Sequence, residues 1–453
     1  MGKPRFQPAS SSASEYRFDP IGFAPVWARS PGQGIQTIVR FEMKTAIYLP
    51  VLIIVICIGL IFSVRDDPAR TNPISAESAP LVPGVLPSSE AITLAKTHTG
   101  VPLLVTGLAD GLIKAIDLTN HGAQLGADLF DAFAAVGETR LAKLEMEATG
   151  SSGVGHAESY TFAQLASAAG DGERHLSSGT NFPEHAEETN SQSVFAFPKF
   201  GPPSPPVTTV VKREGVLLDY EVELCVRFDR DIATVEDFDA ARKGFFLCAD
   251  FTDRAVLSRM IDVDNFDSGS GFSDAKSGPD FFPTGPFLVI PTDWERFVTA
   301  ERITTHRGNS LRQDARGGEM ILNFRQLIEK ALSDLESERF VFRGQHFHLL
   351  DQKRLARGQA LMSGTPEGVI FMPPTSLQIT RGGLQYVLSG SFLRGQSGYD
   401  SVVEAFIREE LRAGRFLQAG EVIRYSSSSM GEISITVVSE NEDEVALNGV
   451  DGP

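Results

Sequence analysis

The chain has 453 residues, which suffices for one large domain, or two smaller domains with tails, and for a sizeable core. Asp and Glu number 58 against 41 Lys and Arg, and the formal charge of −17 argues against a nucleic-acid partner because phosphate binding needs a basic face. Hydrophobic residues make up 42% and charged residues 22%, which fits neither a wholly disordered chain nor a polytopic membrane protein. The 3 Cys exclude a disulfide framework and a four-Cys metal site.

The N-terminal part is predicted to contain a tail, a membrane span and a linker. Residues 1–44 are polar, rich in Ser, Pro and Gly and without a sustained period, so we expect a flexible tail. Residues 45–64 contain no charge, and at ~1.5 Å per residue such a helix crosses a ~30 Å hydrocarbon layer. The alternatives are a buried core helix and, less well supported because 44 residues precede the run, a cleaved signal peptide. Residues 65–90, with Pro, Ser and charges, are typical of a linker.

From residue 91 onward the pattern is that of a folded region with more strand than helix. Residues 91–178 contain helix-like segments such as LFDAFAAV and TRLAKLEMEA and apolar stretches such as VPLLVTGL. From Ser193 short β-branched and aromatic segments alternate with Gly and Pro turns, for example VTTVV, VELCVRF, FLVI, GVIFM and ISITVV. One helix is predicted from Met320, in MILNFRQLIEKALSDLESE. The expected fold class is α+β, mostly β, with an antiparallel or mixed β-roll.

Three carboxylates are candidate metal ligands. Glu221 and Glu223 lie two residues apart in a predicted strand, and side chains with this spacing point to the same face. Two carboxylates ~7 Å apart repel each other unless a cation lies between them. Asp250, after a second apolar segment, would complete a site for a hard cation. The alternative is an exposed strand face with ordinary acidic residues.

A series of motifs in fixed order resembles the fumarylacetoacetate hydrolase family. In chain order the motifs are GTNFPEHAEE with FPKFGPPS, then DYEVEL, CADFTDR, KSGPDFFPTGP, NSLRQD and MSGTPEGV. The resemblance covers roughly residues 179–438. It implies a mixed β-roll of that family's C-terminal type, a catalytic domain over 179–453, and a more loosely similar N-terminal part over 91–178.

The resemblance assigns the metal site and a proton-transfer pair. By position, the family's metal carboxylates fall on Glu221, Glu223 and Asp250, which would bind Mg²⁺ or Mn²⁺, with Ca²⁺ as a further alternative. The family's active-site His and its Glu partner fall on His185 and Glu188, whose spacing places them on one side of a helical turn. Such a pair would deprotonate a water. Without the motif, a surface histidine would be the expected interpretation of His185.

Four further residues are matched to substrate recognition and catalysis. Arg254 and Lys276 match basic positions of the family motifs, and both are expected to contact substrate oxygens, Lys276 as a catalytic residue. Thr365 matches a Thr that receives the substrate carboxylate at a Gly-Pro turn, with plain turn chemistry as the alternative. Gln313 matches the Gln of the RQ motif, in a loop near the metal.

Several positions depart from the family pattern. The residues Ala249, Asp253, Ala255 and Leu257 differ around the metal Asp, and Asp280 replaces the usual Thr. Residues 373–414 lengthen the segment after MSGTPEGV. These departures allow a substrate choice that differs from the family's better-known members.

The function implied by the resemblance is metal-dependent hydrolysis of a carbon–carbon bond in a 1,3-dicarbonyl or acylpyruvate-type oxo acid. A decarboxylase, hydratase or isomerase of a 2-oxo acid on the same fold is the alternative within the family. A catalytically weak binding or scaffold protein is the alternative from another class. The expected partners are a small oxo acid and a membrane contacted through one helix, with no nucleic acid, and family members are commonly homodimers.

The expected localisation is a single-pass membrane protein. Arg29, Arg40 and Lys44 precede the apolar run, and Arg65 and Arg70 follow it. Because basic residues tend to stay cytoplasmic, this bias leans toward an extracytoplasmic catalytic domain. An intracellular oxo-acid substrate argues the other way, and there Cys225 and Cys248 could remain reduced.

Overall fold

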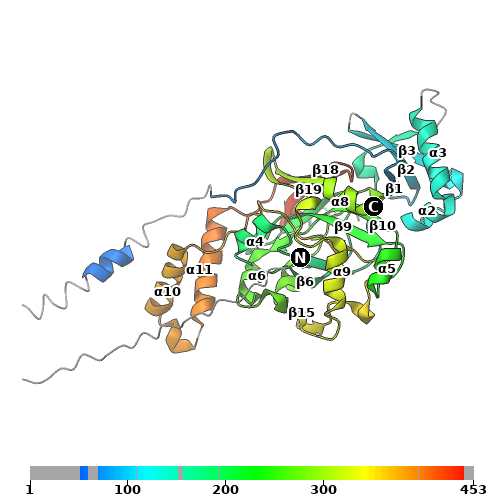
Figure 1. Ribbon diagram of the computed structural model, residues 1–453. Coiled ribbons are helices and arrows are strands. Elements are labelled where there is room, and N and C mark those ends of the chain that lie inside the picture. Colours follow the sequence, from blue (N-terminus) through cyan, green and yellow to red (C-terminus); the bar gives the residue numbers. More distant parts are fainter. Residues whose placement is uncertain are drawn as a thin grey trace, which may run out of the picture. The chain divides into compact units, whose positions relative to one another are not determined.

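The computed structural model describes residues 52–59, 70–109, 111–150, 157–191, 193–395 and 397–442 (Figure 1). The predicted tail at 1–44 lies outside the described residues, as do both ends of the predicted membrane span, 45–51 and 60–64. Residues 52–59 and residues 70–442 belong to two separate units of the chain.

The prediction of a transmembrane helix is corrected by the structure. Residues 52–59 form an apolar helix that rises about 12 Å, less than half of a ~30 Å hydrocarbon layer. Across the described residues, no helix has both the length and the apolar character that crossing a membrane requires. The predicted single-pass localisation and its extracytoplasmic lean are therefore wrong.

The larger sheet of the described residues is mixed and has ten strands, in the order β4-β3-β2-β1-β12-β10-β9-β17-β5-β6. β17 pairs parallel to β5, whereas β9 and β10 pair antiparallel along their whole length. The bounds are β1 Ala91–Lys96, β2 Pro102–Ala109, β3 Leu112–Asp117, β4 Glu158–Tyr160, β5 Arg174–Gly179, β6 Phe195–Phe200, β9 Val222–Phe228, β10 Lys243–Ala249, β12 Leu288–Pro291 and β17 Leu361–Met362.

A second sheet of five strands has the order β14-β13-β18-β19-β7, with β19 and β7 parallel. Two short ribbons pair β11 with β8 and β15 with β16. The bounds are β7 Val207–Lys212, β8 Leu218–Asp219, β11 Thr252–Asp253, β13 Arg302–Arg307, β14 Ser310–Arg316, β15 Phe340–Phe342, β16 Gln345–Phe347, β18 Val422–Ser427 and β19 Glu432–Ser439.

Helices surround the sheets. Helices α10 and α11 lie side by side at one side of the folded unit, where α11 contacts α6 (Figure 1). The bounds are α2 Leu129–Val136, α3 Glu138–Thr149, α4 Pro183–Thr189, α5 Val235–Ala240, α6 Arg254–Met260, α7 Phe272–Lys276, α8 Trp294–Ala300, α9 Phe324–Leu332, α10 Ser376–Leu388 and α11 Gly398–Ala413. The α+β, mostly β architecture predicted from the sequence is confirmed.

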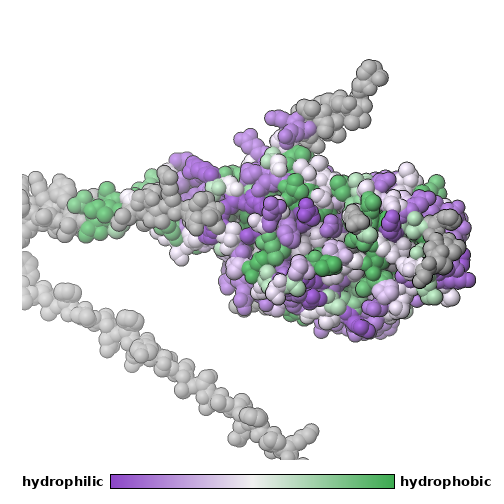
Figure 2. All heavy atoms as spheres, turned by 90° about the horizontal axis from the view of Figure 1, so that it is seen from above, coloured by the Kyte–Doolittle hydropathy of each residue, from purple (hydrophilic) through white to green (hydrophobic). Residues whose placement is uncertain are grey.

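The core lies on both faces of the larger sheet. Leu224 and Val226 of β9 belong to the same apolar cluster as Ile303 and Ile433 of the second sheet, so this face packs between the two sheets. The opposite face contributes to a second cluster with Phe130 of α2. Glu223 and Cys225 alternate with the inter-sheet residues and therefore point to the second face. On the surface seen in Figure 2, hydrophobic and hydrophilic side chains are interspersed.

Two local predictions need correction. GVIFM, residues 368–372, is not a strand. It follows the Gly-Thr-Pro loop and forms no β-ladder with a neighbouring strand. The helix predicted from Met320 begins only at Phe324, since the Asn323 side chain caps it by accepting from the Gln326 N–H at 3.0 Å.

The described part of the predicted linker lies against the folded body. The Asn72 amide donates to the Val369 carbonyl at 2.9 Å, and the Gly84 N–H donates to the Ser428 carbonyl at 2.9 Å. Glu77 pairs with Arg316. Side-chain and main-chain bonds thus hold this segment, although its composition is typical of a linker.

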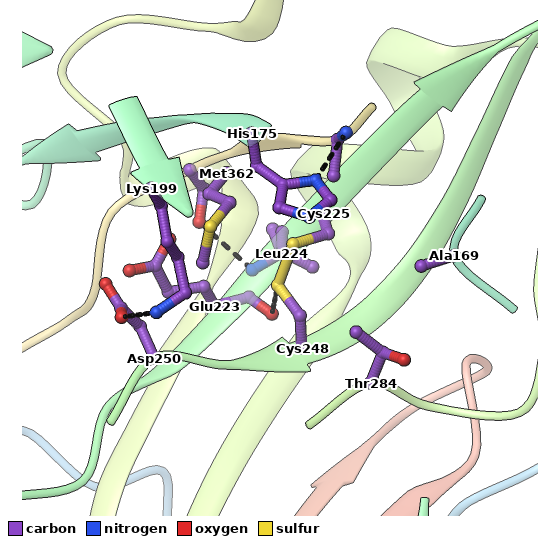
Figure 3. Close-up of a disulfide and its surroundings, with 12 residues drawn as sticks. Ala169, His175, Lys199, Glu223, Leu224, Cys225, Cys248, Asp250, Thr284 and Met362 are labelled. Atoms are coloured by element: carbon purple, nitrogen blue, oxygen red, sulfur yellow. Dashed lines mark hydrogen bonds and ion pairs between the residues drawn. A yellow bond between two sulfur atoms is a disulfide. The ribbon is translucent and has the colours of Figure 1, made fainter. Parts of the chain in front are cut away.

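A disulfide joins two neighbouring inner strands of the larger sheet, β9 and β10. Cys225 of β9 and Cys248 of β10 are bonded, and both are fully buried (Figure 3). The antiparallel register pairs Cys248 with Glu223, so the bridge is diagonal across the ladder. The intracellular alternative, in which these two thiols could remain reduced, did not anticipate this bridge, and a single bridge is not a disulfide framework.

Candidate active site

The three predicted metal carboxylates converge where β9 begins and β10 ends. The pairs Val222 with Ala249 and Glu223 with Cys248 fix the register, and Asp250 follows directly after β10. The Asp250 N–H donates to the Glu221 carbonyl at 2.9 Å, which extends the pairing beyond the ladder. The ligand oxygens of the three carboxylates all lie within 4.8 Å of one another, and all three side chains are buried.

Three cationic side chains surround this triad. The Lys276 ammonium, at the end of α7, contacts Glu221 and lies 2.8 Å from Asp250. The Lys199 ammonium of β6 lies 2.7 Å from the other Asp250 oxygen (Figure 3). Arg254 Nη2 lies 2.5 Å from Glu221 and its Nε lies 2.8 Å from Asp219. Each cation therefore has a carboxylate partner, as buried charges require.

Negative charge nevertheless exceeds positive charge in this cluster. With Asp219, four buried carboxylates face three cations. Burial raises the pKa of Glu223 well above its usual value, and the charge of Asp250 raises it further. Burial lowers the pKa of Lys276, but the charges of Asp250 and Glu221 outweigh it and the net shift is upward. The cluster is thus electrostatically suited to a further cation.

The donor set of the triad fits a hard divalent cation. Carboxylate oxygens are the ligands that Mg²⁺, Mn²⁺ and Ca²⁺ prefer. The Gly364 N–H donates to Glu223 at 2.8 Å and so orients one of the three ligands. The buried triad is therefore able to hold a divalent metal.

His185 and Glu188 form the pair that the sequence predicts. Both lie on α4, which begins with Pro183 at its first turn, and three-residue spacing places them on one face. His185 Nδ1 lies 3.0 Å from Glu188, whose second oxygen accepts from the Gly368 N–H at 2.8 Å. Burial raises the pKa of Glu188, whereas its bond to His185 opposes that shift. Glu188 is thus held in place from both sides.

The loop at residues 363–368 connects the metal triad to the histidine pair. Gly364 donates to Glu223 and Gly368 donates to Glu188. Both glycines have positive φ, and a Cβ on Gly368 would lie 1.8 Å from the Arg312 carbonyl oxygen, so a larger residue does not fit there. This loop therefore fixes the position of the metal triad relative to the histidine pair.

Three of the four predicted substrate-recognition residues line the cavity, and the fourth lies behind it. Arg254, Lys276 and Thr365 line a cavity of about 510 Å³, together with Glu221 and His185. Gln313 lies behind Thr365, to whose hydroxyl its amide donates at 2.8 Å. The Gln313 carbonyl also accepts from the Val222 N–H at 3.0 Å, so this side chain connects Thr365 to the start of β9.

Sequence reasoning missed two buried charges of the site. Lys199 contacts Asp250, and Asp219 receives Arg254 and the N–H groups of Ile370 and Phe371 at 2.8 and 3.0 Å. A lysine inside the apolar strand FAFPKF was the available signal for Lys199. Asp219 was overlooked because it lies two residues before Glu221 in the same short acidic motif.

The positions that depart from the family pattern lie around the site in different ways. Asp253 caps α6 by accepting from the Ala255 N–H at 2.9 Å. Leu257 lines the cavity. Asp280 is exposed and accepts from the Ser204 hydroxyl at 3.0 Å, outside the residues that line the cavity.

Comparison with known proteins identifies the class that this fold and site define. Residues 174–438, more than half of the chain, match the fumarylacetoacetate (FAA) hydrolase C-terminal family. The chain therefore belongs to the fumarylacetoacetate hydrolase family, as the motif series predicts. Among curated proteins, none matches the chain.

Solved structures of related fold include two enzymes that cover 77% of this chain. One is a probable 2-hydroxyhepta-2,4-diene-1,7-dioate isomerase from Mycobacterium abscessus, with 17% identity, a TM-score of 0.45 and 99% of its own chain covered. The other is maleylpyruvate hydrolase from Sphingobium sp. SYK-6 in complex with manganese(II) ion and pyruvate, with 18% identity, a TM-score of 0.45 and 99% of its own chain covered.

Proposed function

We propose that the chain is a metal-dependent hydrolase that cleaves a carbon–carbon bond in an acylpyruvate-type or other 1,3-dicarbonyl oxo acid. The observation that supports this most is that Glu221 of the buried triad and His185 of the histidine pair line the same cavity. A cation-binding triad and a proton acceptor at one cavity are the two components that such hydrolysis needs.

Glu221, Glu223 and Asp250 would hold a divalent cation, either Mg²⁺ or Mn²⁺, with Ca²⁺ as a third alternative. When bound, the cation supplies a Lewis acid beside the oxygens of the oxo acid. Lys276 and Arg254 line the cavity next to Glu221 and stabilise negative charge on substrate oxygens.

His185 acts as the general base for the attacking water. Its Nδ1 is bonded to Glu188, so Nε2 accepts the water proton while the hydroxide oxygen bonds to the distal carbonyl carbon. The carbon–carbon bond then breaks, and its electron pair leaves with the pyruvate half. That half takes up a proton, which gives pyruvate and a carboxylic acid as products.

Thr365 binds the carboxylate of the substrate through its hydroxyl, and Gln313 positions Thr365. The Gln313 amide donates to both the Thr365 hydroxyl and the Pro366 carbonyl, at 2.8 and 3.0 Å. Because Gln313 is fully buried, its effect on catalysis is indirect.

A decarboxylase, hydratase or isomerase of a 2-oxo acid is the second candidate. It shares the metal triad, but decarboxylation needs no activated water, so the His185–Glu188 pair favours hydrolysis. A catalytically weak binding protein is the candidate outside the enzymes. We also propose that the chain forms a homodimer, and analytical ultracentrifugation would measure this oligomeric state.

A substrate panel tests the proposed function. Acylpyruvates, oxaloacetate and 2-hydroxydienoates are incubated with the full chain and Mg²⁺ or Mn²⁺, and products are identified by mass spectrometry. Hydrolysis of an acylpyruvate to pyruvate and an acid supports the proposal. Turnover of oxaloacetate or a hydroxydienoate alone supports the second candidate, and metal binding without any turnover supports the binding protein.

A further inference from the structure

We infer that the substrate carries an apolar acyl or aryl substituent, which lies against a cavity wall built in part by helices α10 and α11. The inference rests on the proposed function and specifies the half of the substrate distal to its 2-oxo acid group. The cavity is about 510 Å³, within the range of roughly 300–1,000 Å³ typical of small-molecule sites.

Two short helices define a polar-to-apolar axis along the cavity. On α6, Arg254 at the first position contacts the triad, and Leu257 lines the cavity about one turn further along. Ile261, which directly follows the helix, also lines the cavity. On α7, Lys276 contacts the triad and Phe272 lines the cavity one turn earlier. Both helices therefore change from charged to apolar lining within about 5–6 Å.

Aromatic contacts extend this axis to the inserted helices. The Arg254 guanidinium carbon lies 5.2 Å from the Phe371 ring centroid, and Phe371 lies 6.1 Å from Phe406 of α11. Two further rings that line the cavity, Phe272 and Phe195, pack with their centroids 4.6 Å apart. All of these rings line the cavity, so apolar surface runs from the charged end to α11.

The α10–α11 wall is packed onto the body. Val403 and Phe406 of α11 share a buried apolar cluster with Ala255 of α6. Arg259 of α6 pairs with Glu404 of α11 at 2.6 Å. This wall comes from the segment that lengthens the chain relative to the family pattern, so the apolar end is a feature of this chain.

The apolar end lacks charged partners for a second carboxylate. Among the described residues that line the cavity, the charged or ionisable groups other than a tyrosine are His185, Glu221, Arg254 and Lys276, all at the polar end. The α10–α11 side instead supplies Ile379, Val402, Val403 and Phe406. Placing a carboxylate there would leave a charge without a partner, which is costly, whereas an alkyl or aryl group gains by burial.

Apolar side chains in this wall are partly exposed, as expected for a surface that a ligand covers. Ile379 of α10 and Val263 of the loop after α6 are 50% and 53% exposed, although both line the cavity. A substituent on the order of six to ten carbons would cover them, which is the size of ligand that cavities in this range hold.

Binding of 2-oxo acids of increasing length tests the inference without requiring turnover. Isothermal titration calorimetry with the Mn²⁺-loaded full chain compares 2-oxobutanoate, 2-oxohexanoate, 2-oxooctanoate and 2-oxodecanoate. We expect affinity to rise roughly threefold to fourfold for each methylene buried. 2-Oxohexanedioate, which replaces the terminal methyl of 2-oxohexanoate by a carboxylate, should bind no better than 2-oxohexanoate.

A matched pair of variants on α10 locates the effect. Ile379→Asp places a charge on the wall and should lower the ratio of 2-oxodecanoate to 2-oxobutanoate affinity by at least tenfold. Val387→Asp is the control, because Val387 is on the same helix, is 58% exposed and does not line the cavity. Its ratio should equal that of the wild type.

The outcomes separate this inference from the proposed function. Affinity that is flat or falls with chain length, or a rise that Ile379→Asp leaves intact, would overturn the apolar substituent even if acetylpyruvate is hydrolysed. Rising affinity with no hydrolysis of acylpyruvates of any length would support the apolar ligand and overturn the hydrolase.

Discussion

The two ends of the cavity are built from different parts of the chain and by different interactions. The polar end lies at the ends of β9 and β10, where buried carboxylates and cations contact one another at 2.5 to 2.8 Å. The apolar end includes the α10–α11 pair, held by side-chain packing and an ion pair on the surface. The catalytic residues therefore lie on the sheet, and the residues proposed to select the substrate lie on an added helical segment. In such an arrangement, substitutions at the polar end should alter catalysis without altering substrate preference, and substitutions at the apolar end should do the reverse.

Loss of one metal carboxylate should have the largest effect. Glu223→Gln or Asp250→Asn removes a charged ligand, so we expect divalent-metal affinity and activity to fall by at least ~10³-fold whatever the chain length of the substrate. Calorimetry with Mn²⁺ measures the affinity, and circular dichroism checks folding because Asp250→Asn removes the negative charge that the buried Lys199 ammonium faces. The exposed Asp280→Asn is the control. Tight metal binding by the triple variant at 221, 223 and 250 would show that the site is elsewhere.

Replacement of the proposed base should have the next largest effect. His185→Ala should lower hydrolysis by roughly 10²- to 10⁴-fold, the usual range for a lost general base, and leave metal affinity nearly unchanged. The relative rates for short and long acyl chains should also stay the same. Near-normal hydrolysis would exclude His185 as the base and favour a decarboxylase or isomerase.

Much of the polar end was predictable, because each residue lies in a short motif. Glu221, Glu223 and Asp250 stand at strand ends, and His185 and Glu188 are three residues apart on a helix. Pairings across long sequence distances were not predictable: Lys199 reaches Asp250, and Gly368 reaches Glu188 only after the loop folds back.

The apolar end and the span were harder to predict for different reasons. Residues 373–414 were recognised as an addition, but helix periodicity does not tell which face lines a cavity. The charge-free run at 45–64 predicted a membrane helix, whereas the structure gives a helix only at 52–59 within the described residues.

Removal of the disulfide should affect stability more than chemistry. Cys225 and Cys248 are 23 residues apart, and opening a loop of this length costs roughly 3 kcal/mol of unfolding free energy. The double variant Cys225→Ala, Cys248→Ala should show this loss in urea unfolding, with Cys57→Ala as the control. Metal affinity should fall only a few fold, since main-chain pairing holds the β9–β10 register. An unchanged unfolding free energy would show that the bridge does not stabilise the fold.

The smallest effect concerns His175 of β5, close to the disulfide at the polar end (Figure 3). Its Nε2 lies 3.1 Å from the Gly201 carbonyl and its Nδ1 accepts from the Ala360 N–H at 3.1 Å, so the neutral ring uses both nitrogens. Burial lowers the pKa of His175 to about 3, and backbone bonding to Gly201 opposes the shift while the charge of Lys199 adds to it.

The pH dependence of stability follows from this shift. Below the ordinary His pKa of about 6.5 the unfolded chain takes up a proton that the folded chain excludes, so stability falls as pH falls toward 3. Between pH 6.5 and 5 we expect a loss on the order of 2 kcal/mol that His175→Gln, which keeps a donor and an acceptor, does not show. Burial raises the pKa of Glu301 to about 7, which stabilises the fold as pH falls, but this contribution cancels when wild type and variant are compared at each pH. The exposed His346→Gln should behave as wild type, and a His175→Gln curve parallel to the wild type would contradict the assignment of His175 as a neutral core residue.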